Sequence, residues 1–156
     1  MKIFIGADHR GFKLKERIVR FLKKKGHRVI DVGTYQDTVS SDYPEISYKV
    51  ARRVTMTKGS RGILICMTGI GNTIAANKVP GAYAALCYNH RAAVLSREHN
   101  DTNILVLGAK FVSPRNFQKI IQTWLTTKFQ GGRHLRRVKQ IKRIERKHCK
   151  GSTKYQ

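Results

Sequence analysis

Short aliphatic segments that alternate with amphipathic ones constrain the fold of this chain more than any other feature. Each aliphatic segment has the length and composition of a buried strand. The predicted strands are KIFIGAD at 2–8, HRVIDVG at 27–33, GILIC at 62–66, AYAALCY at 82–88 and NILVLGA at 103–109. Strands that alternate with helices predict βαβ units. We therefore expect a Rossmann-like three-layer α/β/α sandwich with a five-stranded parallel sheet.

The segments between the strands carry helix signals. Apolar residues recur at helical spacing over 11–25, and Gly26 is a typical stop. Pro44 suits the first turn of a helix that runs to about residue 57, and Pro114 is predicted to open a helix that runs to about residue 127. Two further helices are predicted, one from the T-G-I-G turn through Asn77 and one over 89–98.

The last part of the chain is predicted to form a very basic helix over 133–148. Its apolar residues recur every third position, which gives a narrow stripe that needs a partner surface. The stripe residues are Leu135, Val138, Ile141 and Ile144. With 156 residues, we expect one domain over 1–148 and a flexible tail over 149–156.

The charge balance is unusual: 32 Lys and Arg oppose 9 Asp and Glu, for a formal net charge of +23. Such a surface attracts nucleic acid and other polyanions non-specifically, and it attracts small phosphorylated substrates as well. The charge alone does not choose between these partners.

The cysteines and the apolar runs bear on the environment of the protein. Its three cysteines are scattered without a C-x-x-C pair, which favours a reducing cytoplasm over secretion. No Cys/His cluster has the spacing of a structural zinc site. No apolar run is long enough to span a bilayer, and no signal-peptide core is expected.

Chemically capable residues stand where predicted strands end. Asp8 and His9 follow the first strand, and Cys66 and Thr68 follow the third. Parallel α/β sheets bind ligands at the carboxyl ends of their strands. The sequence therefore predicts a site at this edge of the sheet.

Cys66 has two readings. It can be one more small hydrophobe of a buried strand. Alternatively, at the start of a helix its thiol faces unpaired N–H groups and the positive end of the helix dipole, which lower its pKa and make it a nucleophile or a carbon-acid base. Gly69 and Gly71 favour the second reading, because they allow a tight turn whose N–H groups hold an anion.

Other candidates also have ordinary explanations. Asp8 can be a helix cap beside a surface histidine, and 99–101 can be an ordinary polar loop. Arg133 and Arg137 lie four residues apart, so they share a helix face and can hold one phosphate together, or they can belong to a solvated basic face.

Five blocks of the sequence stand out, and they run in order over nearly the whole chain. They are GADHRGFKLKE, SDYPE, ILICMTGIGNTIAANKV, REHNDTNILVLGA and FQGGRHLRRV. Together they resemble the type B ribose-5-phosphate isomerases, whose family includes allose- and galactose-6-phosphate isomerases. The resemblance implies an aldose–ketose isomerase of the pentose phosphate pathway that works through an enediolate. It implies no metal or other cofactor, and a homodimer or homotetramer whose active site is shared between subunits.

By the same resemblance, Cys66 is the base that moves a proton between carbons 2 and 1 of the sugar phosphate. Thr68 and the backbone of the following turn would hold the developing oxyanion. The residues of that turn are Gly69, Ile70, Gly71 and Asn72.

The resemblance also assigns the remaining contacts. His99 would be the acid that opens the furanose ring, and Asn100 would contact sugar oxygens. Asp8 would contact ring hydroxyls, and Tyr43 would line the same pocket. The residues assigned to the phosphate are His9, Arg133 and Arg137, with Lys110 as a further substrate contact.

Two residues depart from the family pattern. Met67 stands where the family usually has glycine, so its side chain needs space and a glycine-only conformation would be strained. Lys110 stands where the family usually has arginine. This replacement keeps the positive charge but loses the guanidinium group, which can donate two parallel hydrogen bonds to a phosphate. The alternatives are an isomerase for a six-carbon sugar phosphate, which pocket size would decide, and a basic nucleic-acid-binding module on the same fold.

Overall fold

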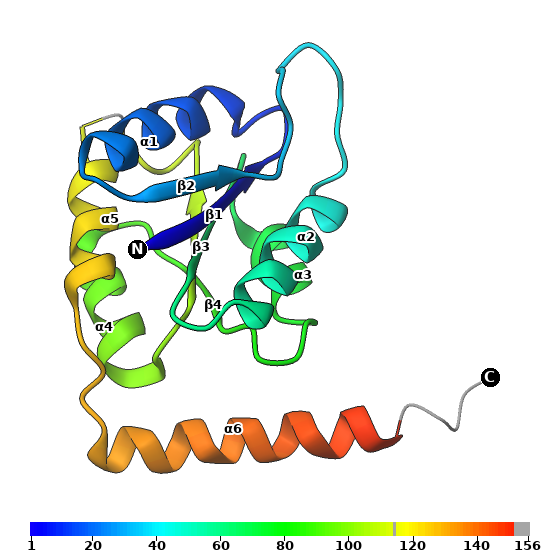
Figure 1. Ribbon diagram of the computed structural model, residues 1–156, viewed down its shortest axis with the longest axis vertical. Coiled ribbons are helices and arrows are strands. Elements are labelled where there is room, and N and C mark those ends of the chain that lie inside the picture. The colour runs from blue at the N-terminus through cyan, green and yellow to red at the C-terminus, as the bar shows by residue number, and fades with distance from the viewer. Residues whose placement is uncertain (114, 152–156) are drawn as a thin grey trace.

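A computed structural model describes residues 1–113 and 115–151, and it shows a sheet covered by helices on both faces (Figure 1). The elements in chain order are β1 (Lys2–Ala7), α1 (Phe12–Lys24), β2 (Arg28–Asp31), α2 (Tyr43–Met56), β3 (Arg61–Cys66), α3 (Ile70–Ala76), β4 (Ala84–Leu86), α4 (His90–Asn100), β5 (Ile104–Gly108), α5 (Phe117–Thr126) and α6 (Gly132–Gly151).

The sheet has five parallel strands in the order β2-β1-β3-β5-β4. This confirms the predicted fold class. The register pairs Ala7 with Ile65 and Cys66 with Gly108, so the three central strands end at nearly the same level.

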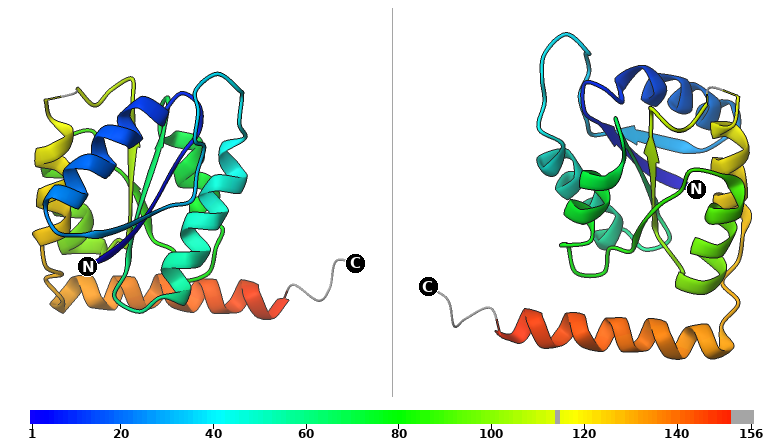
Figure 2. Two further views of the ribbon diagram at one scale, coloured as in Figure 1. Left: turned by 45° about the horizontal axis from the view of Figure 1, so that its top comes forward. Right: turned by 180° about the vertical axis from the view of Figure 1, so that it is seen from behind.

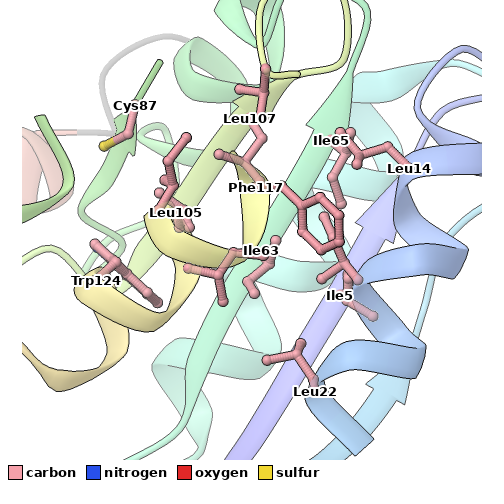
Figure 3. Packing of buried hydrophobic residues seen from close by; sticks show 14 of the residues in the cluster. Ile5, Leu14, Leu22, Ile63, Ile65, Cys87, Leu105, Leu107, Phe117 and Trp124 are labelled. Carbon is pink, nitrogen blue, oxygen red and sulfur yellow. The ribbon is translucent and has the colours of Figure 1, made fainter. Parts of the chain in front are cut away.

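Two apolar layers hold the sandwich together, because successive residues of a strand point to opposite faces. Ile63 and Ile65 of β3 face one layer, which α1 and α5 complete with side chains such as Phe117 (Figure 3). Leu64, between them, packs in the second layer with Val50 of α2. The unbroken aliphatic strands of the sequence follow from this burial on both faces.

Several elements begin or end at other residues than predicted, β4, α5 and α6 among them. β4 is shorter than predicted, because Ala82 and Tyr83 bond in turns and to Asn103 before the edge strand begins. α5 begins at Phe117, and the predicted start at Pro114 lies outside the described residues. α6 continues to Gly151, into the segment predicted as a tail, whose residues 152–156 are also outside the described part.

α6 runs across the amino-terminal edge of the sheet, apart from the two helical layers (Figures 1 and 2). Its Glu145 carboxylate accepts a hydrogen bond from the N–H of Gly81, just before β4, at 2.7 Å. Of the predicted apolar stripe only Val138 is buried, and Ile144 is 58% exposed. Most of the stripe therefore lies uncovered in the single chain. Within the described residues, no helix is long and apolar enough to cross a membrane.

Candidate active site

The loops after β1, β3 and β5 meet at the carboxyl edge of the sheet. The N–H of Asp8 donates to the carbonyl of Ile65 at 3.3 Å. The N–H of Lys110 donates to the carbonyl of Met67 at 3.0 Å. These main-chain bonds extend the sheet by a residue or two and hold the predicted site residues of three strands side by side.

Cys66 is buried and hydrogen-bonded at this edge. Its side chain is 5% exposed, and its Sγ accepts the N–H of Gly69 at 3.0 Å. Gly69 has φ of 85°, and a Cβ there would lie 2.4 Å from Leu86 Cδ1, so the turn requires glycine. An N–H that donates to sulfur stabilises the negative charge of a thiolate. Because α3 has only seven residues, this direct contact matters more than the helix dipole.

Cys87 provides a contrast within the same fold. It is also buried, in the layer of α1 and α5, and burial raises its pKa to about 11, although a hydrogen bond with Ser96 opposes the shift. Its sulfur therefore stays a neutral thiol at physiological pH. The reading as a small core hydrophobe suits Cys87.

Asp8 and His9 are both held in place by short polar contacts. Asp8 Oδ1 accepts the N–H of Gly11 at 2.9 Å, so this carboxylate caps the turn before α1. His9 exchanges two bonds with Ser41: its N–H donates to Ser41 Oγ at 3.1 Å, and its Nδ1 accepts the Ser41 N–H at 3.3 Å. Because Nδ1 accepts, the ring proton sits on Nε2, which remains available as a donor.

A cleft of about 570 Å³ opens beside these residues. It is lined by His9, Arg10, Lys13, Asp37, Met67, Ala109 and Lys110. Met67 has an ordinary backbone, since Asp101 is the sole non-glycine residue with positive φ in the described chain. The strain anticipated for a residue in place of glycine is therefore absent, and Met67 forms part of the cleft wall.

Tyr43 and Asn72 complete the carboxyl-edge group. The Tyr43 ring lies against the first turn of α3, where a Cβ on Gly71 would come within 2.5 Å of its Cζ. Asn72 is 1% exposed, and its Oδ1 has no hydrogen-bond partner among the described residues. A buried amide oxygen without a partner is costly, so this group is suited to a ligand or a water molecule.

The other predicted site residues lie at the opposite edge of the sheet. His99 and Asn100 end α4 just before β5 begins, and the His99 ring stacks on that of His134, with centroids 4.1 Å apart and an interplanar angle of 6°. Arg133 directly precedes His134 on α6, and Arg137 follows three residues later on the same helix. A single chain therefore does not bring His9 together with the two arginines.

Three residues of the two clusters escaped the sequence prediction. Ser41 orients His9, Arg10 contacts Met67, and His134 stacks on His99. All three lie inside or next to the blocks that carry the family resemblance. Their contacts join residues at least 32 positions apart, the separation of His9 and Ser41, and such pairings leave no local signal.

The fold and the carboxyl-edge cluster define an α/β protein that gathers a thiol and several polar groups in the loops after its central strands. The chain belongs to the Ribose/Galactose Isomerase family, whose model matches residues 3–141.

Individual relatives are similar over almost their full length. Ribose-5-phosphate isomerase B of Escherichia coli is 44% identical over 146 residues, which cover 94% of this chain and 97% of that protein. The solved ribose-5-phosphate isomerase B of Clostridium thermocellum is 53% identical with a TM-score of 0.92, covering 95% of this chain and 99% of its own. That of Mycoplasma genitalium, solved with bound ribulose-5-phosphate, is 41% identical with a TM-score of 0.89, covering 93% and 96%.

The stacked histidines predict a pH-dependent stability. Burial lowers the pKa of His134, and the charges of His99, Arg133 and Arg137 act in the same direction, against Glu98. The unfolded chain then binds more protons than the folded one below the ordinary histidine pKa of about 6.5, so stability falls as pH falls through that value. Melting temperatures measured from about pH 7 to about pH 5 should decline less for His134→Phe than for the wild type.

The matched control for this series is His90→Phe, since His90 is exposed at the other end of α4. It should keep the full decline of the wild type. Equal slopes for His134→Phe and the wild type would contradict the assignment.

Proposed function

We propose that this chain interconverts ribose 5-phosphate and ribulose 5-phosphate, as a cytoplasmic enzyme of the pentose phosphate pathway, with Cys66 as the base. The observation that carries the proposal is the Gly69 N–H donating to Cys66 Sγ at 3.0 Å at a ligand-binding sheet edge. Family membership and the relative with bound ribulose-5-phosphate support the reaction.

The central step, which follows ring opening, is proton transfer between neighbouring carbons. The Cys66 thiolate removes the proton from carbon 2 of the open-chain aldose, the hydroxyl proton moves from the oxygen of carbon 2 to that of carbon 1, and the resulting thiol returns its proton to carbon 1. The enediolate oxygen needs donors in a site that excludes water. Gly71 and Asn72 supply them, because first-turn N–H groups have no acceptor within their own helix.

The second requirement is a group that opens the sugar ring and groups that hold the phosphate. We assign ring opening to His99, sugar contacts to Asn100 and Asp8, and phosphate binding to Arg133 and Arg137. His9 and Lys110 contribute from the cleft. Since His99 and Cys66 lie at opposite edges of one sheet, the two clusters complete a site only when they come from different copies of the chain.

We therefore propose a homodimer, or a homotetramer built from it, with shared active sites. The uncovered apolar residues of α6 support this assembly: Leu135 is 41% exposed and Ile141 is 43% exposed. A second copy packed along this helix would bury them and place His99, Arg133 and Arg137 opposite a partner's cleft.

A five-carbon substrate is favoured over the six-carbon alternative. Met67, the residue after Cys66, lines the cleft, and a shorter residue there would leave more room for a longer sugar. The preference is measured by the ratio of kcat/KM for ribose 5-phosphate and allose 6-phosphate.

Replacing Cys66 by serine keeps the shape of the site but removes the thiolate. We expect kcat for ribose 5-phosphate to fall by about 10²- to 10⁴-fold, the typical contribution of a general base. Cys87→Ser is the matched control, because this second buried cysteine lies away from the site and should leave turnover unchanged. Substantial turnover by Cys66→Ser would remove the cysteine from its role.

The shared site predicts complementation between two inactive variants. Cys66→Ser and Arg137→Ala should each be nearly inactive alone. After unfolding and refolding together, mixed dimers hold one intact site, so about a quarter of wild-type activity should return if copies pair at random. No recovery, with mixed dimers verified by mass spectrometry, would place both residues in one chain's site.

A second function, non-specific binding of nucleic acid, is favoured by the outer face of α6. Glu145 is the only acidic residue of this helix and is bonded to Gly81. No ion pair in the described part of the chain involves the helix's cations. Four of these cations follow each other at helical spacing: Arg136, Lys139, Arg143 and Lys147.

If this face binds RNA, changing its four cations to glutamine should weaken binding of a labelled single-stranded RNA and flatten its salt dependence. The control changes Arg20, Lys23, Lys24 and Lys25 at the end of α1, which removes the same charge elsewhere. Equal losses from both sets would mean that only net charge matters and would exclude a site on α6.

A further inference from the structure

The cleft that is lined by Met67, the residue after Cys66, contains cations that the fold does not neutralise. Lys13 pairs with Asp37 at 3.4 Å. Asp37 is the only acid among the lining residues, and no ion pair of the described chain involves Arg10 or Lys110. The cleft therefore carries an uncompensated positive charge that suits an anionic group of a ligand.

Arg10 is held at this cleft by an unusual partner. Its Nη1 donates to the thioether sulfur of Met67 at 3.0 Å. A thioether is a weak acceptor without charge, so the contact orients the guanidinium and leaves its charge intact. The guanidinium has five N–H donors, so most remain free for a ligand. An exposed arginine would otherwise have many rotamers to lose on binding.

The position of the pair links it to the reacting group. Met67 directly follows Cys66, and its carbonyl accepts the N–H of Lys110, whose side chain lines the same cleft. Arg10 directly follows His9, whose ring Ser41 fixes. Arg10 thus lines the same cleft as His9 and Lys110, two residues assigned to substrate binding.

We infer that Arg10 binds the phosphate of the substrate from the chain that carries Cys66, and that Met67 is a positioning residue acting through Arg10. This inference rests on the proposed isomerase function. Arg10 would contribute a planar guanidinium that can donate two parallel hydrogen bonds to the phosphate, whereas the Lys110 ammonium in the same cleft acts as a point charge. The inference also gives Met67 a role beyond filling space.

Arg10→Ala tests the contact. Loss of one charge-assisted bond to phosphate at a partly exposed site should raise KM for ribose 5-phosphate about tenfold, with a much smaller change in kcat. The inhibition constant of inorganic phosphate should rise by the same factor. Arg53→Ala is the matched control: it removes the same charge from an exposed position of α2 outside the cleft. Equal KM values for the two variants would overturn the inference.

Met67→Leu tests the positioning role, since leucine keeps the bulk and lacks the sulfur acceptor. KM should rise by a smaller factor than in Arg10→Ala. In the Arg10→Ala background the same change should have no further effect, because Met67 acts through Arg10. If the KM of the double variant rises by the product of the two single-variant factors, the positioning role of Met67 is overturned.

If the wild-type protein lacks isomerase activity, the proposed function is refuted. The inference that Arg10 binds phosphate would still be open to a separate test. Calorimetric titration with inorganic phosphate then decides it separately. Binding that is weakened in Arg10→Ala and kept in Arg53→Ala supports the site, and equal binding by all three proteins refutes it.

Discussion

The parallel hydrogen-bond register of β1, β3 and β5 is the constraint on which the rest of this structure depends. It brings three loops to one level, so that Asp8, Cys66 and Lys110 become neighbours although they are distant in sequence. A shift of one residue in β3 would turn its buried side chains to the other layer and break the pairing of Cys66 with Gly108 of β5. The same burial that stabilises the sheet therefore sets the geometry of the thiol.

The site is built from contacts that orient groups without neutralising them. Gly69 offers a main-chain N–H to sulfur, Ser41 fixes the His9 ring, and a thioether holds Arg10. Carboxylates that would cancel the positive charge are scarce, with Lys13–Asp37 as the ion pair of the cleft. An arrangement of this kind suits a small dianionic substrate, because the charge of the site is balanced when that substrate binds.

Local signals were sufficient for most of the fold. Gly26, with φ of 77°, ends α1 where predicted, and Pro44 stands in the first turn of α2. These signals work because they depend on the backbone of one or two residues. They were weaker for β4, an edge strand whose ends depend on bonds to Asn103, and for the end of α6, where charged residues continue the helical pattern without a stop until Gly151.

The sequence by itself determined the βα alternation, the strand ends that carry Asp8 and Cys66, and the family. All of these follow from periodicity and short motifs. Only the tertiary structure decided that a main-chain N–H donates to Cys66 Sγ whereas burial dominates at Cys87, that Met67 is unstrained and contacts Arg10, and that His99 lies across the sheet from the thiol. The physical reason is that these properties depend on residues far apart in the chain. They are the burial of a side chain, its hydrogen-bond partners and the edge of the sheet at which a helix ends.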